Sequence, residues 1–260
     1  MLIYNYHTHT ARCGHASGSD EEYVQAAIKA GYKILGFSDH APFSRYYRPG
    51  NHMHWEELDG YLESILSLKE KYKDQIEILV GLESEHYDFA TEERRQLKER
   101  IDYMLLGQHY TDPYTSDGIS FFKEVSDDKI MEYADTVCKA LDTGIYTYLC
   151  HPDVFLNHQN VFTEACGKAA HMIGKKCEET KTPVEINIRG IGKGLKPFDY
   201  GEDYWYPNKK FWTILSQYDI RATVGIDAHD PKDLLKLDDI DRAMGHLKDL
   251  NIKIIEEPFI

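Results

Sequence analysis

Short runs of apolar and β-branched residues alternate along this chain with longer segments whose apolar residues recur at helical spacing. Seven runs have the length and composition of buried strands, at 2–6, 34–38, 76–82, 103–106, 145–149, 183–188 and 222–226. The segments between and after them predict helices at 20–30, 55–72, 91–100, 127–141, 164–181, 209–217 and 231–247. This repeat predicts an α/β fold with a parallel barrel or a doubly wound sheet.

The predicted elements carry local signals at their ends. Ser19 precedes three acidic residues, which is typical of a capped helix start, and Pro231 fits the first position of the last helix. Three connections, 41–54, 110–125 and 191–207, are longer than the others. In a barrel, such connections at the carboxyl ends of the strands usually wall the active site.

Composition limits the class of protein. With 260 residues and 42% hydrophobic content, the chain is expected to form one domain, 1–260. It has no apolar stretch of about 18 residues and begins with a strand-like run, so we expect a cytoplasmic protein without a membrane partner. A net charge of −14 argues against a nucleic-acid partner and favours a small substrate, while the oligomeric state stays open. The five cysteines are expected to be free thiols.

Potential metal ligands occur where the predicted strands end. Six of the seven runs are followed by histidine, aspartate or glutamate, and one further histidine lies in the loop after the first run. In a parallel barrel the carboxyl ends of all strands meet at one face, so these side chains are expected to converge in one pocket. The candidate ligands are His7, His9, His15, His40, Glu83, His109, His151, Asp227 and His229.

The residue types indicate the kind of metal site. In a strand, the two histidines of His7-Thr8-His9 point the same way, because side-chain direction has a period of two. Imidazole together with carboxylate suits zinc, manganese or iron, and the lack of thiolates argues against a closed structural zinc site. A single histidine at a strand end is more often only hydrogen-bonded, but this many groups on successive strand ends indicate a functional site. Structural roles are expected for Cys13, His52, His54, His86, His158, His171 and His246.

The order of these motifs resembles the polymerase and histidinol phosphatase (PHP) superfamily over essentially the whole chain. The matching motifs are His-Thr-His, Cys-Gly-His, Ser-Asp-His, Gly-Leu-Glu, Gly-Gln-His, His-Pro and Asp-Ala-His, in that order. The resemblance implies a distorted (β/α)7 parallel barrel with three divalent metal ions, most simply zinc, with manganese or iron as alternatives. The ligand sets it implies are His7, His9, Glu83 and Asp227 for one ion, Glu83, His109 and His151 for a second, and His15, His40 and His229 for a third.

Within that superfamily the chain most resembles the stand-alone histidinol-phosphate phosphatases of histidine biosynthesis. The resemblance implies a metal-dependent phosphatase that hydrolyses L-histidinol phosphate by direct attack of an activated water on phosphorus. A phosphoesterase for another small phosphomonoester or a cyclic phosphate stays open, because fold and metal site do not fix the substrate. An exonuclease and a noncatalytic metal-binding module are further alternatives.

Particular residues are predicted to act in the reaction. Glu83, Asp227 and Asp39 are the candidate catalytic carboxylates. Arg189 is the candidate phosphate ligand, because it follows the one predicted strand whose end carries no metal ligand and a guanidinium complements phosphate oxygens. Arg12 is a second candidate substrate-binding residue, and the remaining groups of the substrate could meet Glu85, Asp112 or tyrosines of the long connections.

Overall fold

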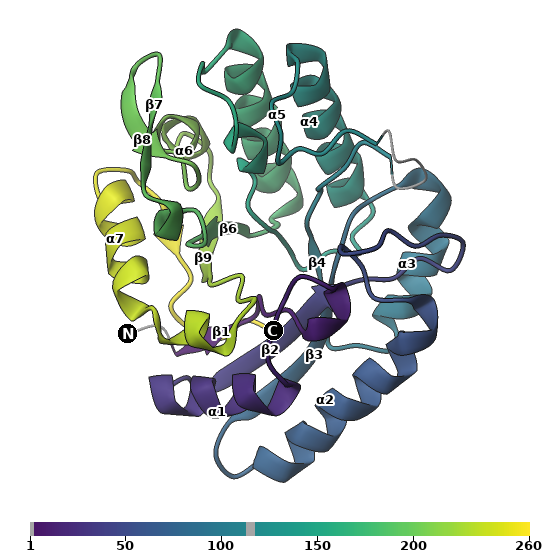
Figure 1. Cartoon of the computed structure of the whole chain (residues 1–260). Coiled ribbons are helices and arrows are strands. Elements are labelled where there is room, and N and C mark those ends of the chain that lie inside the picture. The colour runs from purple at the N-terminus through teal and green to yellow at the C-terminus, as the bar shows by residue number, and fades with distance from the viewer. Residues whose placement is uncertain (1–2, 113–117) are drawn as a thin grey trace.

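A computed structural model of the chain describes residues 3–112 and 118–260, so Leu2 of the first predicted strand and 113–117 of the second long connection lie outside the described residues. Its main feature is a curled eight-stranded sheet in the order β1-β2-β3-β4-β5-β6-β9-β10, in which neighbouring strands are parallel (Figure 1). The strands are β1 (Tyr4–Asn5), β2 (Ile34–His40), β3 (Glu77–Ser84), β4 (Tyr103–Leu106), β5 (Tyr148–Leu149), β6 (Val184–Asn187), β9 (Arg221–Gly225) and β10 (Lys253–Ile254).

The two sides of the curled sheet meet at a seam beside β1. Beyond the strand ends, Thr8 forms a parallel bridge with Ala228. The backbone N–H of His9 donates to the Ala228 carbonyl at 2.9 Å, and the N–H of Ala228 donates to the His7 carbonyl at 3.1 Å. At the amino-terminal end of these strands, β10 pairs with β9, and the Tyr4 hydroxyl of β1 donates to the Ile255 carbonyl that follows β10, at 2.5 Å. The sheet is therefore a distorted, nearly closed parallel barrel.

Seven α-helices among the described residues lie around the outside of the sheet (Figure 1). Their packing follows from their sequence pattern; in α4, for example, residues three or four apart such as Ile130, Tyr133, Ala134 and Val137 are buried. The predicted cap of α1 is confirmed, because Ser19 and Glu22 form a reciprocal capping box. The helices are α1 (Asp20–Ala30), α2 (Leu58–Tyr72), α3 (Thr91–Lys98), α4 (Asp127–Asp142), α5 (Glu164–Thr180), α6 (Lys209–Leu215) and α7 (Leu237–Leu247).

The amino-terminal end of the barrel is filled by aromatic side chains. Tyr4, Tyr6, Tyr103 and Tyr148 are each at most 1% exposed and form one cluster with apolar neighbours. The Tyr103 hydroxyl lies 2.7 Å from the Tyr6 carbonyl and 2.9 Å from the Phe37 carbonyl, to which it can donate. This end of the barrel is packed shut, so a ligand must enter from the other end.

Glycines make room for the Tyr103 ring. A β-carbon at Gly81 would lie 2.4 Å from the ring, and one at Gly36 would lie 2.3 Å from its hydroxyl oxygen. These approaches are closer than van der Waals contact permits, so both positions need glycine to accommodate the ring.

The predicted barrel is confirmed, with two additions that the sequence did not predict. The short strand β10 adds to the seven predicted strands, and the connection 191–207 contains an antiparallel hairpin of β7 (Leu195–Phe198) and β8 (Gly201–Tyr204). Two predicted helices begin as separate 3-10 turns, Trp55–Glu57 and Pro231–Leu235, with Pro231 at the predicted start. The expectation of free thiols is also confirmed, because all five cysteines are unpaired.

Candidate metal centre and active-site pocket

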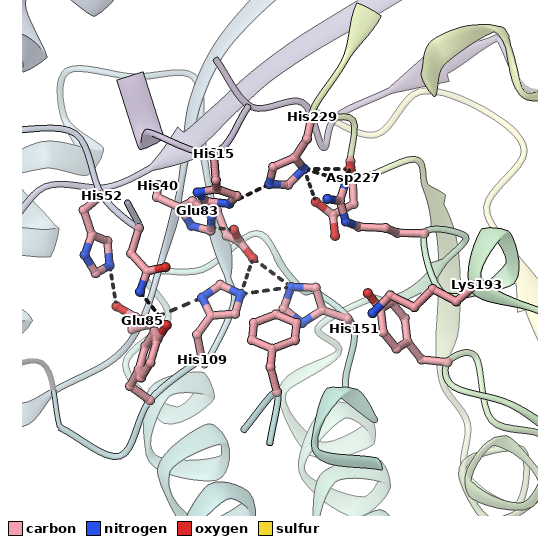
Figure 2. A pocket seen from close by; sticks show the side chains of 15 residues that line it. His15, His40, His52, Glu83, Glu85, His109, His151, Lys193, Asp227 and His229 are labelled. Carbon is pink, nitrogen blue, oxygen red and sulfur yellow. Dashed lines mark hydrogen bonds and ion pairs between the residues drawn. The ribbon is translucent and has the colours of Figure 1, made fainter. Parts of the chain in front are cut away.

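The nine candidate ligands meet at the carboxyl end of the barrel. Seven of them line a cavity of about 290 Å³: His15, His40, Glu83, His109, His151, Asp227 and His229 (Figure 2). The other two, His7 and His9, are fully buried against its inner side, where their rings contact the lining residues. The register of the parallel strands explains this arrangement, because it brings side chains far apart in sequence to one end of the sheet.

Four of these side chains have the spacing of ligands around one ion. His7 Nε2 lies 3.6 Å from Glu83 Oε1 and 3.6 Å from Asp227 Oδ1. His9 Nε2 lies 3.5 Å from Glu83 Oε2 and 3.3 Å from Asp227 Oδ1. Ligand atoms that are each about 2.0–2.1 Å from a tetrahedral ion are separated by roughly 3.3 Å, so these distances fit a divalent transition metal.

The hydrogen bonding of the same atoms supports this assignment. His7 Nε2 and His9 Nε2 are buried and have no hydrogen-bond partner, and the buried Glu83 Oε2 faces imidazole nitrogens, with His40 Nδ1 at 3.0 Å and His9 Nε2 at 3.5 Å. Buried polar atoms are nearly always satisfied, so a group of unpartnered ones in one place indicates a missing ligand. Because these atoms are imidazole nitrogens and a carboxylate oxygen, the donor set fits a divalent metal ion.

A second group forms on Glu83 Oε1, the oxygen that also faces His7. Glu83 Oε1 lies 2.9 Å from His151 Nε2 and 3.4 Å from His109 Nε2, and these two nitrogens are 3.3 Å apart. The Glu83 carboxylate therefore lies within reach of two groups of imidazoles, His7 with His9 and His109 with His151. A carboxylate in this position could be shared by two ions.

The three histidines predicted to hold a third ion, His15, His40 and His229, do not form one separate group. His15 and His229, two members of the third predicted set, have their Nε2 atoms 2.9 Å apart, which is a hydrogen-bond distance. His40, however, directs Nδ1 at Glu83 Oε2, 3.0 Å away, and groups with His9 and His229. Cys13 has a sulfur near His15 and His229, but its thiol donates to the Thr10 carbonyl at 3.2 Å. The membership of a third ligand set stays a prediction.

Two candidate ligands have backbone conformations that side chains seldom adopt. His151 has φ of 26° and Asp227 has φ of 55°. For residues other than glycine, such conformations cost about 1–3 kcal/mol each, and they persist where the surrounding structure enforces them. Their occurrence at two predicted ligands indicates that the backbone is held in place to aim these side chains.

Mutual electrostatic effects are strong in this cluster. Burial by itself lowers the pKa of His109, but Glu83 and Glu85 outweigh it and raise the pKa to about 10. Burial raises the pKa of Glu83, yet the surrounding imidazoles His109, His7 and His40 lower it well below its ordinary value. The cluster therefore favours positive charge among its carboxylates, and protons compete there with a metal cation.

The predicted phosphate ligand Arg189 lines the cavity. Its Nη1 donates to the Asp227 carbonyl at 3.0 Å and lies 2.9 Å from His229 Nδ1, while its side chain is 36% exposed. Lys193, one turn further along the chain, lines the same cavity (Figure 2). Two cationic side chains thus stand on one side of the ligand cluster.

Two other predicted residues lie outside the cavity lining. Asp39 is fully buried, accepts hydrogen bonds from the Thr10 hydroxyl and the His40 N–H, and lies 3.4 Å from His9 Nδ1. Arg12 donates to Asp20 at 2.9 Å and contacts the Tyr61 ring. A catalytic role for Asp39 and substrate binding by Arg12 stay predictions.

Sequence reasoning missed several residues of the site. One is His52, which lines the cavity and donates to Glu85 at 2.9 Å, so the purely structural role expected for His52 is incomplete (Figure 2). Glu85, named from the sequence as a possible substrate contact, lines the same cavity. Glu185 and Asn187 in β6 contact the ligands from behind. Their signal was present, because two polar residues two positions apart in an otherwise apolar strand share one face. The other lining residues are Asn51, Tyr110, Phe122 and Tyr206.

Comparisons with known proteins point to the same family as the sequence motifs. A family model of the PHP domain matches residues 5–189. A "probable histidinol-phosphatase" of Schizosaccharomyces pombe is 31% identical over 249 residues, which cover 86% of this chain and 80% of that protein. One of Deinococcus radiodurans is 29% identical over 158 residues, 57% of this chain, and the match spans only 59% of that protein's length.

The fold also matches a solved structure. Histidinol phosphate phosphatase of Lactococcus lactis, in complex with zinc, L-histidinol and phosphate, superposes with a TM-score of 0.74 at 19% identity, covering 98% of this chain and 95% of that one. At this identity the likeness shows the fold. Separately, none of the helices in the described part of the chain is long and apolar enough to cross a membrane.

Proposed function

This chain belongs to the PHP domain family, and from the site at the carboxyl end of its barrel we propose that it hydrolyses L-histidinol phosphate to L-histidinol and phosphate. The observation that carries the proposal is the composition of one cavity. Its metal-ligand cluster lies between two cationic side chains, Arg189 and Lys193, and a buried carboxylate, Glu85. A phosphate ester that also bears an amine has the charges that such a cavity complements.

We further propose that the site holds three divalent ions, with zinc as the simplest choice. His7, His9, Glu83 and Asp227 would hold one, Glu83, His109 and His151 a second, and His15, His40 and His229 a third. When bound, such ions activate water for attack and neutralise charge on the phosphoryl oxygens. The zinc in the Lactococcus lactis structure supports this choice of metal.

The cationic side would bind the phosphate. Arg189 presents a guanidinium whose parallel N–H groups match two phosphoryl oxygens, whereas Lys193 adds a point charge. Asn157 Oδ1 accepts from Lys193 Nζ at 3.0 Å and holds that ammonium beside the cavity. Both side chains would therefore hold the phosphate beside the candidate ligand cluster that contains Glu83 and Asp227.

The opposite side would bind the histidinol part. Glu85 is 1% exposed and one of its oxygens accepts from His52. Its Oε1 is buried without a hydrogen-bond partner, and His109 Nδ1 lies 3.6 Å away from it. An ammonium or imidazolium group would satisfy that oxygen and compensate its charge. The Phe122 ring, stacked on His109 at 5.3 Å, offers a flat apolar surface to an imidazole.

The proposal is tested by measuring kcat/KM of the purified, zinc-loaded protein on a substrate panel. The panel contains L-histidinol phosphate, an alkyl phosphomonoester without an amine, a cyclic nucleotide and single-stranded DNA. We expect L-histidinol phosphate to be preferred by more than about tenfold, and Glu85→Gln to raise KM for it without raising KM for the alkyl phosphomonoester. A cyclic nucleotide or DNA as the best substrate would overturn the proposal.

Metal content tests the ion assignment separately. Elemental analysis of the active protein is expected to give about three transition-metal ions per chain, with zinc supporting full activity after chelation and reloading. Fewer than two ions per active chain would contradict the assignment.

A further inference from the structure

Among the described strands of the barrel, β6 and the two-residue β10 are followed by no candidate metal ligand, yet the interior face of β6 is polar. Glu185 is fully buried and Asn187 is 1% exposed, and both side chains lie against the ligand cluster. Burying a carboxylate is costly unless several donors satisfy it. The partners of Glu185 therefore indicate what its burial achieves.

Glu185 is hydrogen-bonded to two candidate ligands. Its Oε1 lies 2.7 Å from His7 Nδ1, so the imidazole donates through Nδ1 and keeps its Nε2 lone pair free. That Nε2 atom is the one that faces Glu83 and Asp227. The second oxygen, Oε2, accepts from the backbone N–H of His151 at 3.1 Å.

The contact with His151 bears on its unusual backbone. The φ of 26° at His151 lies outside the conformations that a histidine readily adopts, and Pro152 follows it. A buried acceptor at its N–H stabilises this conformation. The side chain of His151 is thereby directed toward Glu83, with Nε2 at 2.9 Å from Oε1.

Asn187 extends the contacts to a third ligand. Its Nδ2 donates to Glu185 Oε2 at 2.9 Å and lies 3.2 Å from Asp227 Oδ2. Asp227 therefore has one oxygen engaged by Asn187 and the other, Oδ1, directed at His7 and His9. Glu185 thus connects, directly or through Asn187, the three residues His7, His151 and Asp227, whose ligand atoms form one close group.

The barrel provides the space for this carboxylate on the neighbouring strand. A β-carbon at Gly225 would lie 1.8 Å from Glu185 Oε1. Gly225 pairs with Asn187 in the ladder between β6 and β9. The sequence therefore keeps this position without a side chain where the Glu185 carboxylate lies.

We propose that Glu185 is a positioning residue for metal binding: it fixes the tautomer of His7, the backbone of His151 and, through Asn187, the orientation of Asp227. The inference rests on the metal centre of the proposed function. Carboxylates behind histidine ligands typically change metal affinity about 10- to 100-fold when they are replaced.

Glu185→Gln tests this proposal because glutamine has a single acceptor oxygen. If that oxygen faces His7, the amide NH₂ faces two other donors, the His151 N–H and the Asn187 amide. If the amide is reversed, its NH₂ favours the His7 tautomer with Nδ1 as the acceptor, which puts a proton on Nε2. Either orientation disturbs at least one ligand while changing the volume very little.

The experiment measures zinc affinity of the full chain by competition with a chromogenic chelator, together with the visible spectrum of the cobalt-loaded protein. Glu185→Gln is expected to weaken binding of at least one ion by about 10- to 100-fold and to change the cobalt bands. Asp203→Asn is the matched control, because Asp203 is also a buried carboxylate bonded to a histidine, His246, but lies outside the cavity. The control is expected to keep wild-type zinc affinity.

Two results would overturn the proposal. One is Glu185→Gln with wild-type ion number, wild-type affinity and an unchanged cobalt spectrum. If that variant does not fold, Glu185→Asp replaces it, because the shorter carboxylate withdraws an acceptor from His7. Glu185→Asp should weaken zinc binding about tenfold. The second result that would overturn the proposal is wild-type zinc affinity in Glu185→Asp. A wild-type chain that binds no zinc would instead contradict the proposed metal centre, so the two failures are distinguishable.

Discussion

The two ends of the barrel interior are built on the same strands but have opposite chemistry. Strand β3 shows this directly: Leu79 lies in the aromatic cluster of the amino-terminal end, Gly81 lies under the Tyr103 ring, and Glu83 lies in the ligand cluster. These alternate residues share one face of the strand. The amino-terminal end is filled by packing that needs no ligand, whereas the carboxyl end gathers buried charges that need a cation. Stability and chemistry are therefore expected to respond to different mutations.

The largest effect on activity is expected for Glu83→Gln at the carboxyl end. This change removes a charge that faces two groups of imidazoles, so kcat/KM should fall by more than about 100-fold, beyond the loss from any single histidine ligand, and bound metal should decrease. The control is His86→Gln, because His86 is also buried but contacts Tyr146 and Asp88 outside the cavity. Comparable losses in the two variants, measured by steady-state kinetics, would contradict the bridging role.

Arg189→Ala should have the next largest effect. Losing a charged hydrogen bond to phosphate costs about 1.5–3 kcal/mol of transition-state stabilisation, which corresponds to roughly 10- to 150-fold in kcat/KM. Because Arg189 also contacts Asp227 and His229, the loss is measured at saturating zinc, with elemental analysis to show that the variant retains its metal. Arg189→Lys should recover part of the loss, since an ammonium cannot form two parallel bonds. An unchanged kcat/KM for Arg189→Ala would move the assignment to Arg12 or Lys193.

The pH dependence should distinguish the metal-loaded and chelated states. Burial lowers the pKa of His109, but Glu83 and Glu85 raise it overall to about 10, so a metal must displace a proton at neutral pH. At limiting zinc, activity should therefore fall as pH decreases from about 9 to 5. In the chelated protein the stability follows the opposite trend with pH. The protonated His109 stabilises the fold, and this contribution is complete below about pH 6.5 and is lost as pH rises through about 10. A rate independent of pH at limiting zinc would contradict this.

The smallest effect on activity is expected at the packed end. Tyr103→Phe removes a buried hydroxyl positioned to donate to the carbonyls of Tyr6 and Phe37, so unfolding free energy should decrease by about 1–3 kcal/mol. Urea denaturation measures this loss. The kcat/KM of the folded variant should stay within about twofold of wild type. A large kinetic loss without a stability loss would show that the two ends are coupled.

Periodicity predicted the barrel because each of its seven main strands carries a buried apolar run. It did not predict β10, since a pair of residues, Lys253 and Ile254, is too short to show a strand period. The hairpin of β7 and β8 was also missed, because Pro197 and Gly201 give that connection the composition of a loop. Short elements that are stabilised by contacts with other segments show no periodicity of their own, so they cannot be predicted from the sequence pattern.

The candidate site shows the same division. Ligands at strand ends could be located because a parallel sheet brings those ends together whatever the loops do. His52 could not, because its place in the cavity depends on the path of the connection 41–54, which no periodicity encodes. Glu185 and Asn187 could have been found, since polar residues on the inner face of a buried strand require partners.

The candidate metal centre lies across the seam beside β1, so a bound ion would connect the two sides of the barrel. Between β1 and the segment after β9, the Thr8–Ala228 bridge is supplemented by the Asn5 side chain, which accepts from the Ile226 N–H at 2.9 Å. An ion held by His7, His9 and Asp227 would cross this seam and act as a removable cross-link between early and late parts of the chain. By analogy with covalent loop closure, a link from residue 7 to residue 227 restricts the unfolded chain by on the order of 5 kcal/mol. Metal loading would then depend on completion of the last ligand-bearing strand, and chelation would loosen the barrel first along this seam.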